Sequence, residues 1–366
     1  MLRVVWIVPG FSSNKDDWCI PALLDLAQAV ANRCHLKIVA MRYPYRRDRY
    51  PLAGATVYSI GGGHRGMRYT PGIWRDTAHV VRGIPCDLLH AFWAYEPGLV
   101  AAWFSPRLPV VVSLAGGESV SLPGIGYGQM RKWRTRIMIR WALERARAVT
   151  AGSPYLVDHA RQTLRLPGIR HMPFGVDLRR WPFSSHEAAP PMILNAGSLE
   201  PVKGQSILLR ALSQVLPEMP LVRCRIVGGG REREKLEKLA NVLGLSGRVE
   251  FAGQVPHPGM AAVYGGAALF VQSSWHEAQG MAVIEAAACG LPLAGTAVGA
   301  MADFAPDAAT GTPAGDERQL AAAVLQLLSH RDLAGESGRR ARAKVEQTYG
   351  IETAADRFLE LYQSLV

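Results

Sequence analysis

The sequence predicts an α/β protein made of two doubly wound domains, each a parallel sheet with helices on both faces. Three observations lead to this prediction. The chain has 366 residues, more than a single hydrophobic core usually supports. Short apolar runs alternate with helical segments, and the runs are continuously apolar, as strands buried on both faces are. A Pro-rich stretch at 179–191 interrupts this alternation and reads as a linker.

The expected strands follow from the apolar runs. In the first half they lie at 4–8, 36–41, 56–60, 87–92, 109–114 and 148–152, with helical patterns such as 20–33 and 131–147 between them. After the linker they lie at 192–197, 223–227, 249–253, 268–274 and 291–295. We therefore expect one domain over 1–185 and a second from 186. A ligand is expected in a cleft at the carboxyl ends of the strands.

Composition and charge narrow the function classes. Half-apolar composition, 49% hydrophobic with 19% charged residues, is typical of a compact globular protein. Residues 1–185 carry 25 Lys and Arg against 11 Asp and Glu, a balance of +14, whereas the remainder has −3. This asymmetry favours an anionic partner for the first domain: a membrane surface, a phosphorylated acceptor or nucleic acid.

Two further features bear on the compartment. The longest uncharged run, 286–302, is broken by three glycines and a proline, so we do not interpret it as a transmembrane helix. The five cysteines form no C-x-x-C pair and are odd in number. They favour a reducing cytoplasm over a disulfide framework or a zinc site.

Two segments that follow expected strands have the composition of phosphate sites. Gly228, Gly229 and Gly230 stand between a strand and a helix, where bare glycines let backbone N–H groups approach a phosphate. Lys203 stands beside Gly204 after another strand and offers a point charge. Each feature alone has an ordinary alternative, a common strand–Gly–helix turn and a surface lysine.

The segment "EAQGMAVIEAAACG" combines both kinds of group. Gly280 and Met281 open a short helix whose N–H groups can face a phosphate, and Glu277 comes just before them. Glu285 lies inside the apolar helix, where a ribose diol would satisfy its buried carboxylate. A buried salt bridge to an arginine is the alternative.

These motifs in this order resemble those of the retaining glycosyltransferases of family 4. The segments "AGSLEPVKGQSILLRAL", "RIVGGGREREKL" and "FVQSSWHEAQGMAVIEAAACGLPLAG" are similar to the family's C-terminal domain with its Glu-x7-Glu motif. Upstream, "RHMPFGVDLRRW" resembles the family's Pro-x-Gly-Val-Asp segment. The resemblance implies the two-Rossmann GT-B architecture with a cleft. It also implies a nucleotide-sugar domain over 186–346, an acceptor domain over 1–185 and a helix at 347–366 that crosses back to the acceptor domain.

The resemblance also implies roles for single residues. Glu285 would hold the nucleotide ribose, and Lys203 would neutralise the diphosphate. Glu277 would contact the donor sugar, and with Lys203 it forms the implied catalytic pair. The remaining implied donor contacts are Gln279, Gly280 and Met281 at the diphosphate and Val255 at the base, with Ser198, Gly228, Gly230 and Arg231 in the neighbouring loops.

The implied reaction is transfer of a hexose from a UDP- or GDP-sugar with retention of the anomeric configuration. The resemblance implies no metal and no further cofactor, and the acceptor would be a saccharide, a lipid-linked sugar or a small molecule. Cell-envelope polysaccharide or glycolipid synthesis would use such an enzyme. Two alternatives stay open: a nucleotide-sugar epimerase of the same fold, and a non-catalytic relative that binds a nucleotide sugar or a lipid.

Some positions depart from the family pattern. Ser198 stands where an arginine is common, so phosphate charge would rest on Lys203 alone or with Arg231. Ala115 replaces a histidine near the reacting centre. His90, at a strand end, and Glu118 are our candidates for contact with the acceptor. For each of them a purely structural role is the alternative.

The stretch 129–147 is the best indication of a partner. Trp133, Ile137 and Trp141 recur at four-residue spacing among several arginines. This pattern predicts either a helix lying on anionic lipid or a packed helix with a solvated basic face. Nucleic acid fits less well, because no known binding module accompanies the charge. We thus expect a cytoplasmic protein that is peripheral at the inner face of the cell membrane if the helix binds lipid.

Overall fold

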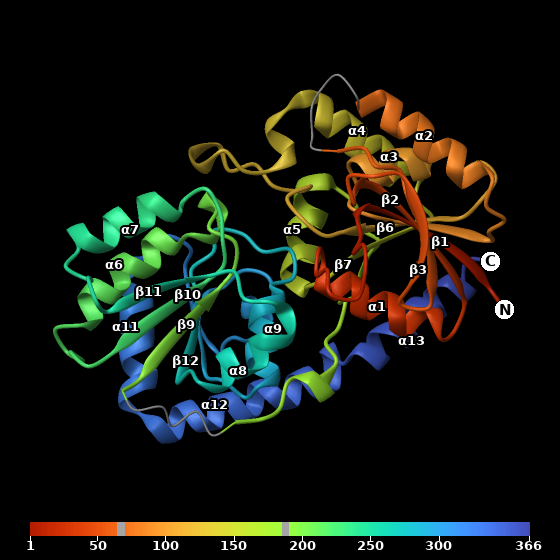
Figure 1. Cartoon of the computed structure of the whole chain (residues 1–366). Coiled ribbons are helices and arrows are strands. Elements are labelled where there is room, and N and C mark those ends of the chain that lie inside the picture. The colour runs from red at the N-terminus through yellow and green to blue at the C-terminus, as the bar shows by residue number, and fades with distance from the viewer. Residues whose placement is uncertain (64–69, 185–189) are drawn as a thin grey trace. The chain divides into compact units, whose positions relative to one another are not determined.

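The computed structural model describes residues 1–63, 70–184 and 190–366. The chain divides into two compact units (Figure 1): unit 1 contains Met1–Gly175 and Ile351–Val366, and unit 2 contains Val176–Gly350. Each unit has one sheet, and the prediction of two Rossmann-like α/β domains is confirmed. No helix of the described residues is long and apolar enough to cross a membrane.

Unit 1 has an eight-stranded sheet in the order β3-β4-β2-β1-β5-β6-β7-β8, parallel except for the β3–β4 hairpin. Its strands are β1 (Arg3–Gly10), β2 (His35–Tyr43), β3 (Asp48–Leu52), β4 (Ala55–Ser59), β5 (Leu88–Phe92), β6 (Val110–Leu114), β7 (Ala148–Ala151) and β8 (Ile169–His171). Its helices are α1 (Pro21–Ala31), α2 (Thr70–Arg82), α3 (Glu96–Ala102), α4 (Trp133–Arg145), α5 (Pro154–Leu164) and α13 (Ile351–Gln363).

Unit 2 has a six-stranded parallel sheet in the order β11-β10-β9-β12-β13-β14. Its strands are β9 (Met192–Ala196), β10 (Arg223–Val227), β11 (Val249–Gly253), β12 (Leu269–Gln272), β13 (Leu293–Thr296) and β14 (Thr310–Thr312). Its helices are α6 (Gln205–Val215), α7 (Arg233–Val242), α8 (Met260–Gly265), α9 (Met281–Ala288), α10 (Ala300–Phe304), α11 (Glu317–Ser329) and α12 (Arg331–Lys344).

Unit 2 has a hydrophobic core on each face of its sheet. Buried side chains of α6, α7 and α11 form one core, with Leu208, Leu236 and Leu320 among them. Those of α8, α9 and α12 form the other. Burial on both faces explains why the strand sequences are continuously apolar instead of alternating.

The boundary between the units lies earlier than the expected 185/186, and the C-terminal segment of unit 1 begins at 351 instead of 347. The reason is packing upstream of the linker. Val176 donates its backbone N–H to the carbonyl of Tyr349 at 2.8 Å. Trp181 is buried in the core of unit 2 together with Val176 and Tyr349. These residues therefore belong to unit 2.

The last helix belongs to unit 1. Tyr362 of α13 is buried and accepts a hydrogen bond from Trp6 Nε1 of β1 at 3.1 Å. Arg33, just after α1, forms ion pairs with Glu352 and Asp356 of α13, at 2.6 and 2.9 Å. All five cysteines are free thiols in this structure.

Candidate functional site

The candidate site of unit 2 lies where the strand order reverses. The chain winds outward from β9 to β10 on one side and to β12 on the other, so the loops after β9 and β12 diverge at the carboxyl edge of the sheet. Open α/β sheets bind ligands at this position. Hydrogen bonds to backbone carbonyls join the loops: Trp275 N–H donates to Val202 O at 2.8 Å, and Ser273 Oγ donates to Lys203 O at 3.0 Å.

Each of these loops ends in a glycine that starts a helix. Gly204 precedes α6 with φ +62°, and Gly280 precedes α9 with φ +85°, both in the left-handed region. A Cβ on Gly204 would lie 2.1 Å from the carbonyl oxygen of Ser273, so no larger residue fits. The helix N-termini, with their positive partial charge, therefore begin directly behind the joined loops.

Lys203 and Glu277, expected as the catalytic pair, are in contact. Lys203 Nζ lies 2.7 Å from Glu277 Oε1, and the same oxygen accepts a hydrogen bond from Ser274 Oγ at 2.7 Å. The side chains are 27% and 12% exposed, so the pair is partly screened from water but open to a ligand. A cation held in this way can meet an anionic group while it stays oriented by its carboxylate.

Glu285, the carboxylate inside apolar α9, has two partners that sequence analysis did not predict. His257 Nε2 lies 3.1 Å from Oε1, and Tyr264 OH donates to Oε2 at 2.9 Å. Burial, with the neighbouring carboxylate, raises the pKa of Tyr264 well above its usual value, so its hydroxyl remains a donor. The arginine partner considered as an alternative is not the one that the structure shows.

Trp181 supports both partners of Glu285. Its ring meets the ring of His257 edge-on at 5.4 Å between centroids and that of Tyr264 edge-on at 5.5 Å. The only signal in the sequence for His257 is its place two residues after Val255, in the loop expected at the base. Tyr264 shows no signal, because it lies in an ordinary helical pattern.

In the glycine loop after β10, one of the expected phosphate contacts is already engaged by the protein. The N–H of Gly228 donates to Gly253 O at 2.8 Å, so it is not directed at a phosphate. A Cβ on Gly228 would lie 1.9 Å from Gly197 O, and one on Gly230 would lie 2.4 Å from Leu199 O. These glycines therefore let the loop after β10 pack against the loop after β9, which carries Lys203.

The other expected donor contacts surround this arrangement. Arg231 pairs with Glu200 at 2.9 Å and is 69% exposed, so its charge is directed at the neighbouring loop. Ser198 is exposed, Val255 is half-buried, and Gln279 is buried, with its carbonyl accepting from Ala300 N–H at 2.6 Å. Met281 is the first residue of α9.

His90 does not lie at an acceptor surface, contrary to one of the two interpretations considered. It is fully buried, and its ring nitrogens contact Tyr362 OH at 2.6 Å and Ser113 Oγ at 2.7 Å. Burial lowers the pKa of His90 to about 3, so the ring is neutral. A neutral imidazole with both nitrogens in use connects α13 to the strands and offers nothing to a substrate.

Glu118 is also buried, and its carboxylate is engaged by backbone. Oε1 accepts from the N–H groups of Ala94 and Ala115 at 3.2 and 3.3 Å, and Oε2 accepts from Gly116 at 2.7 Å. Burial raises its pKa against the effect of these bonds. Glu118 thus joins the loops after β5 and β6, and it also lines a hollow at this edge of unit 1.

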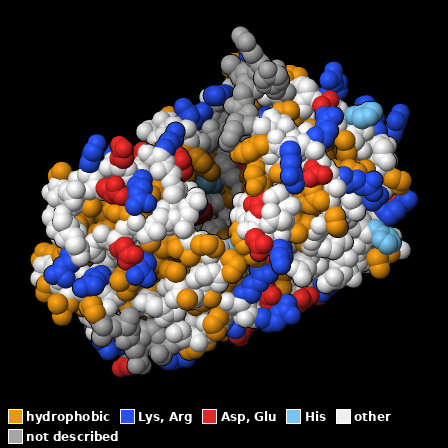
Figure 2. All heavy atoms as spheres, in the orientation of Figure 1, with side chains coloured by type: hydrophobic (Ala, Val, Ile, Leu, Met, Phe, Trp, Pro, Cys, Tyr) orange, Lys and Arg blue, Asp and Glu red, His pale blue; other side chains and the backbone are white. Residues whose placement is uncertain are grey.

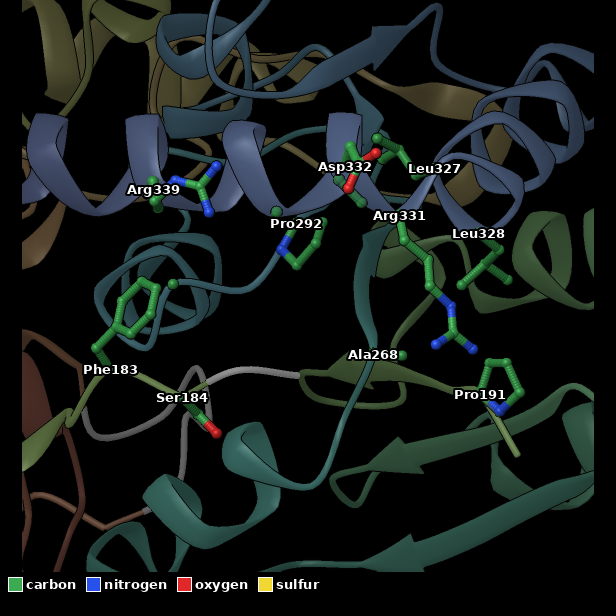
Figure 3. Close-up of a pocket in the computed structure, with 13 residues that line it drawn as sticks. Phe183, Ser184, Pro191, Ala268, Pro292, Leu327, Leu328, Arg331, Asp332 and Arg339 are labelled. Carbon is green, nitrogen blue, oxygen red and sulfur yellow. The ribbon is translucent and has the colours of Figure 1, made fainter. Parts of the chain in front are cut away.

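A hollow of unit 2, of about 510 Å³, lies apart from the expected donor residues (Figure 3). Phe183, Pro292, Arg331 and Arg339 are among its lining residues, and none of the expected donor residues lines it. It lies along α12, beside the carboxyl end of α9 rather than its amino end. We therefore do not assign the donor to it.

Two protein families match successive parts of the chain. Residues 22–180 match "Glycosyltransferase Family 4", and residues 179–344 match "Glycosyl transferases group 1". A curated relative from Corynebacterium glutamicum, 28% identical over 218 residues, is a GDP-mannose-dependent monoacylated alpha-(1-6)-phosphatidylinositol monomannoside mannosyltransferase. A D-inositol 3-phosphate glycosyltransferase from Thermomonospora curvata is 32% identical over 181 residues. The matches cover 54% and 47% of this chain, and 57% and 42% of these relatives' own lengths.

Solved structures match the fold over the whole chain. Sucrose-phosphate synthase from Thermosynechococcus elongatus has a TM-score of 0.85 at 21% identity, with 99% of each chain covered. The Anabaena protein HepE, solved in complex with UDP and glucose, has a TM-score of 0.76 at 20% identity, with full coverage of both chains. At these identities the likeness concerns the fold.

Proposed function

Since the chain belongs to the group 1 and family 4 glycosyltransferases, we propose that it transfers a sugar from a nucleotide sugar with retention of the anomeric configuration. The observation that carries the proposal is the pair of joined loops at the reversal point of unit 2. They bring together a lysine, two carboxylates and two glycine-initiated helix N-termini. These are the groups that a nucleoside diphosphate sugar needs.

We assign the ribose to Glu285. Its carboxylate is held by His257 and Tyr264, and each oxygen keeps further acceptor capacity for a hydroxyl of the diol. Because Val255 lies in the same loop as His257, the base would lie over that loop. A buried carboxylate with fixed partners favours ligands with hydroxyl groups over ligands without them, because the latter would leave the carboxylate without a further hydrogen-bond donor.

We assign the diphosphate to Lys203 and the amino ends of α6 and α9. Negative charge develops on the diphosphate as the bond to the sugar breaks, so groups aimed at it stabilise the transition state more than the bound donor. Glu277 orients Lys203 and lies where the donor sugar would begin. We propose that Lys203 and the helix N-termini stabilise the negative charge of the diphosphate without a metal ion.

The alternatives keep the same site. An epimerase would bind the same donor and interconvert its sugar, and a non-catalytic relative would only bind it. Ser198 and Ala115 keep the second alternative open, because they replace groups that the family commonly carries. The joined Lys203–Glu277 pair favours transfer, since binding alone does not need an oriented cation at the leaving group.

We also propose that the protein binds the membrane surface peripherally, through α4 of the unit expected to bind the acceptor. On α4, Trp133 is 65% and Ile137 is 59% exposed, next to Arg134 and Arg136, which are also exposed. Trp141, the third residue of the pattern, is half-buried. Two curated relatives are named for a phosphatidylinositol mannoside and for inositol phosphate, so a lipid-linked, saccharide or small polyol acceptor is consistent with them.

A panel of UDP-, GDP-, ADP- and dTDP-sugars, analysed by mass spectrometry, tests the proposal. We expect release of nucleoside diphosphate from at least one donor, by transfer or slow hydrolysis, and we expect it to persist in EDTA. Interconversion of the donor sugar would show an epimerase, and binding without turnover would show a non-catalytic protein. Loss of turnover in EDTA, restored by Mg²⁺ or Mn²⁺, would contradict the metal-free part.

A further inference from the structure

Unit 1 contains a hollow of about 960 Å³ at the carboxyl edge of its own sheet. Pro9 of β1 and Arg42 of β2 line it, with the loops after β5 and β6 and the segment 126–135. In the strand order, β1 stands between β2 and β5, so this edge is also a reversal point, where open α/β sheets bind ligands. The hollow is thus placed for a ligand of its own.

The floor of the hollow is a buried ion pair. Arg42 Nε donates to Glu96 Oε2 at 2.7 Å and Nη2 donates to Oε1 at 2.5 Å, and the side chains are only 8% and 3% exposed. A buried pair of this kind contributes little net stability compared with apolar packing. It does give the hollow a polar, charge-neutral floor, where hydroxyl groups can find acceptors and donors.

Four aromatic residues line the hollow, and two of them, Trp93 and Tyr127, lie against the glycine pair Gly116–Gly117. A Cβ on Gly116 would lie 2.9 Å from Nε1 of Trp93, and one on Gly117 would lie 3.0 Å from the ring of Tyr127. Trp93 has φ +71°, a strained conformation for a bulky residue that surrounding structure must enforce. Both rings line the hollow, and their apolar faces suit the C–H groups of a saturated ring.

The rim is strongly basic. Arg131, Lys132 and Arg134 line the hollow and are exposed, and among the described residues no carboxylate forms an ion pair with any of them. Arg131 donates to the carbonyl of Gly126, and the guanidinium of Arg134 lies 5.3 Å from the ring centre of Trp133. Three positive charges without a carboxylate partner at one opening are suited to a phosphate.

We propose that this hollow binds a phosphorylated polyol, a hydroxylated ring that carries a phosphate, either free or as the headgroup of a lipid. The phosphate lies at the basic rim, the ring packs on Trp93 and Tyr127, and its hydroxyls face the Arg42–Glu96 floor. The claim that this ligand is the acceptor rests on the proposed function. The claim that the hollow binds such a ligand does not.

In the transfer, an acceptor hydroxyl oxygen bonds to the anomeric carbon of the donor sugar. The bond from that carbon to the diphosphate oxygen breaks, and the hydroxyl proton passes to the departing diphosphate. The phosphate of the polyol takes no part in this exchange. It supplies binding energy away from the reacting bond.

Isothermal titration of the full chain tests the binding site. The probes are myo-inositol 1-phosphate, glucose 6-phosphate, the two polyols without phosphate, and inorganic phosphate. For lipid, vesicles of phosphatidylcholine with phosphatidylinositol are compared with vesicles that hold the same fraction of phosphatidylserine. We expect at least one phosphorylated polyol to bind tenfold or more tightly than its unphosphorylated form and inorganic phosphate, or phosphatidylinositol vesicles to be preferred tenfold.

Matched variants locate the binding. Replacing Arg131, Lys132 and Arg134 with Gln is expected to weaken it tenfold or more. Replacing Arg75, Arg82 and Arg107, which are exposed in unit 1 outside the hollow, removes as much charge and is expected to change it less than twofold. Equal loss in both variants would show general charge attraction and overturn the proposal. So would equal binding of phosphorylated and unphosphorylated probes, or no preference for any probe or vesicle.

The outcomes also separate this inference from the proposed function. If a soluble phosphorylated polyol binds, the site needs no lipid. If only phosphatidylinositol vesicles are preferred, the ligand is a lipid headgroup. If a phosphorylated polyol binds but no donor is turned over, the proposed function fails and the binding site stands. If a donor is turned over but no phosphorylated polyol binds in either form, the binding site fails alone.

Discussion

Glu285 illustrates how a charged residue is accommodated inside an apolar helix. Its position in the sequence indicated a ligand or a buried partner, and that much could be predicted from the surrounding apolar residues. The identity of the partners could not, because His257 and Tyr264 come from elsewhere in the chain and meet α9 only after folding. The bond from Ser274 to Glu277, by contrast, is local and spans three residues of one loop.

The two donor-site charges are expected to affect different kinetic quantities. Glu285→Gln should weaken nucleotide-sugar binding by about 1–3 kcal/mol, because it removes a charged hydrogen-bonding group. Lys203→Ala should lower kcat more than it weakens binding, because the diphosphate charge grows in the transition state. Titration calorimetry and steady-state kinetics measure both, with Glu250→Gln, an exposed carboxylate of β11, as the control. Unchanged kinetics in both variants would refute the assignment.

His90 predicts a pH dependence of stability. Its pKa is lowered to about 3 in the folded protein, so below pH 6.5 the unfolded chain binds a proton there that the folded chain does not. The free energy of unfolding should therefore fall with decreasing pH, at up to about 1.4 kcal/mol per pH unit from this residue. Urea unfolding between pH 6.5 and 5 measures the slope. If His90→Gln has the same slope as the parent protein, His90 is not responsible.

At the scale of elements, the strands of both sheet centres were predictable because they are continuously apolar. Of the four edge strands, β11 was predicted at 249–253, but β3, β8 and β14 were not. β3 alternates between half-buried and exposed residues, contains Pro51 and two charged residues, and pairs only with β4. β8 and β14 have three residues each, too few for a hydrophobic pattern. The pairing of the Gly228 N–H could not be predicted, because its partner Gly253 follows later in the chain, in β11.

α4 predicts binding to anionic membranes. Its exposed Trp133 and Ile137 suit the headgroup region, and the neighbouring cations add about 1 kcal/mol each near an anionic surface. We expect the protein to sediment with vesicles of anionic lipid, much less with neutral ones, and less at high salt. Replacing Arg131, Lys132, Arg134 and Arg136 with Gln should release it. Equal sedimentation with both vesicle types, or none, would leave α4 an ordinary solvated helix.

For the whole molecule, the structural units divide the charge differently from the sequence halves, and the excess of positive charge stays on the first domain. Unit 1 carries 24 Lys and Arg against 13 Asp and Glu, whereas unit 2 carries 17 of each. The net charge of +11 thus belongs to unit 1 alone. Figure 2 shows Lys and Arg side chains spread over the visible face, with acidic side chains among them. An anionic partner is consequently expected at unit 1, and the proposed donor site lies in a unit without net charge.

The division into units was predictable only approximately. The Pro-rich stretch marks a linker, but Val176 and Trp181 before it pack into unit 2 through contacts with residues near 350. Composition cannot reveal such a contact, because it joins segments far apart in the chain. The proposed donor residues could be selected from the sequence because they follow strands of one unit.

The central claim is that the joined loops of unit 2 hold the donor. Hydrogen–deuterium exchange of the full chain with and without a nucleoside diphosphate tests it most directly. Bound UDP or GDP should slow exchange in the loops after β9 and β12, at 197–204 and 273–281, and in the His257 loop at 254–260. Slowed exchange confined to unit 1, or along the α12 hollow that Phe183 and Arg339 line, would contradict the claim.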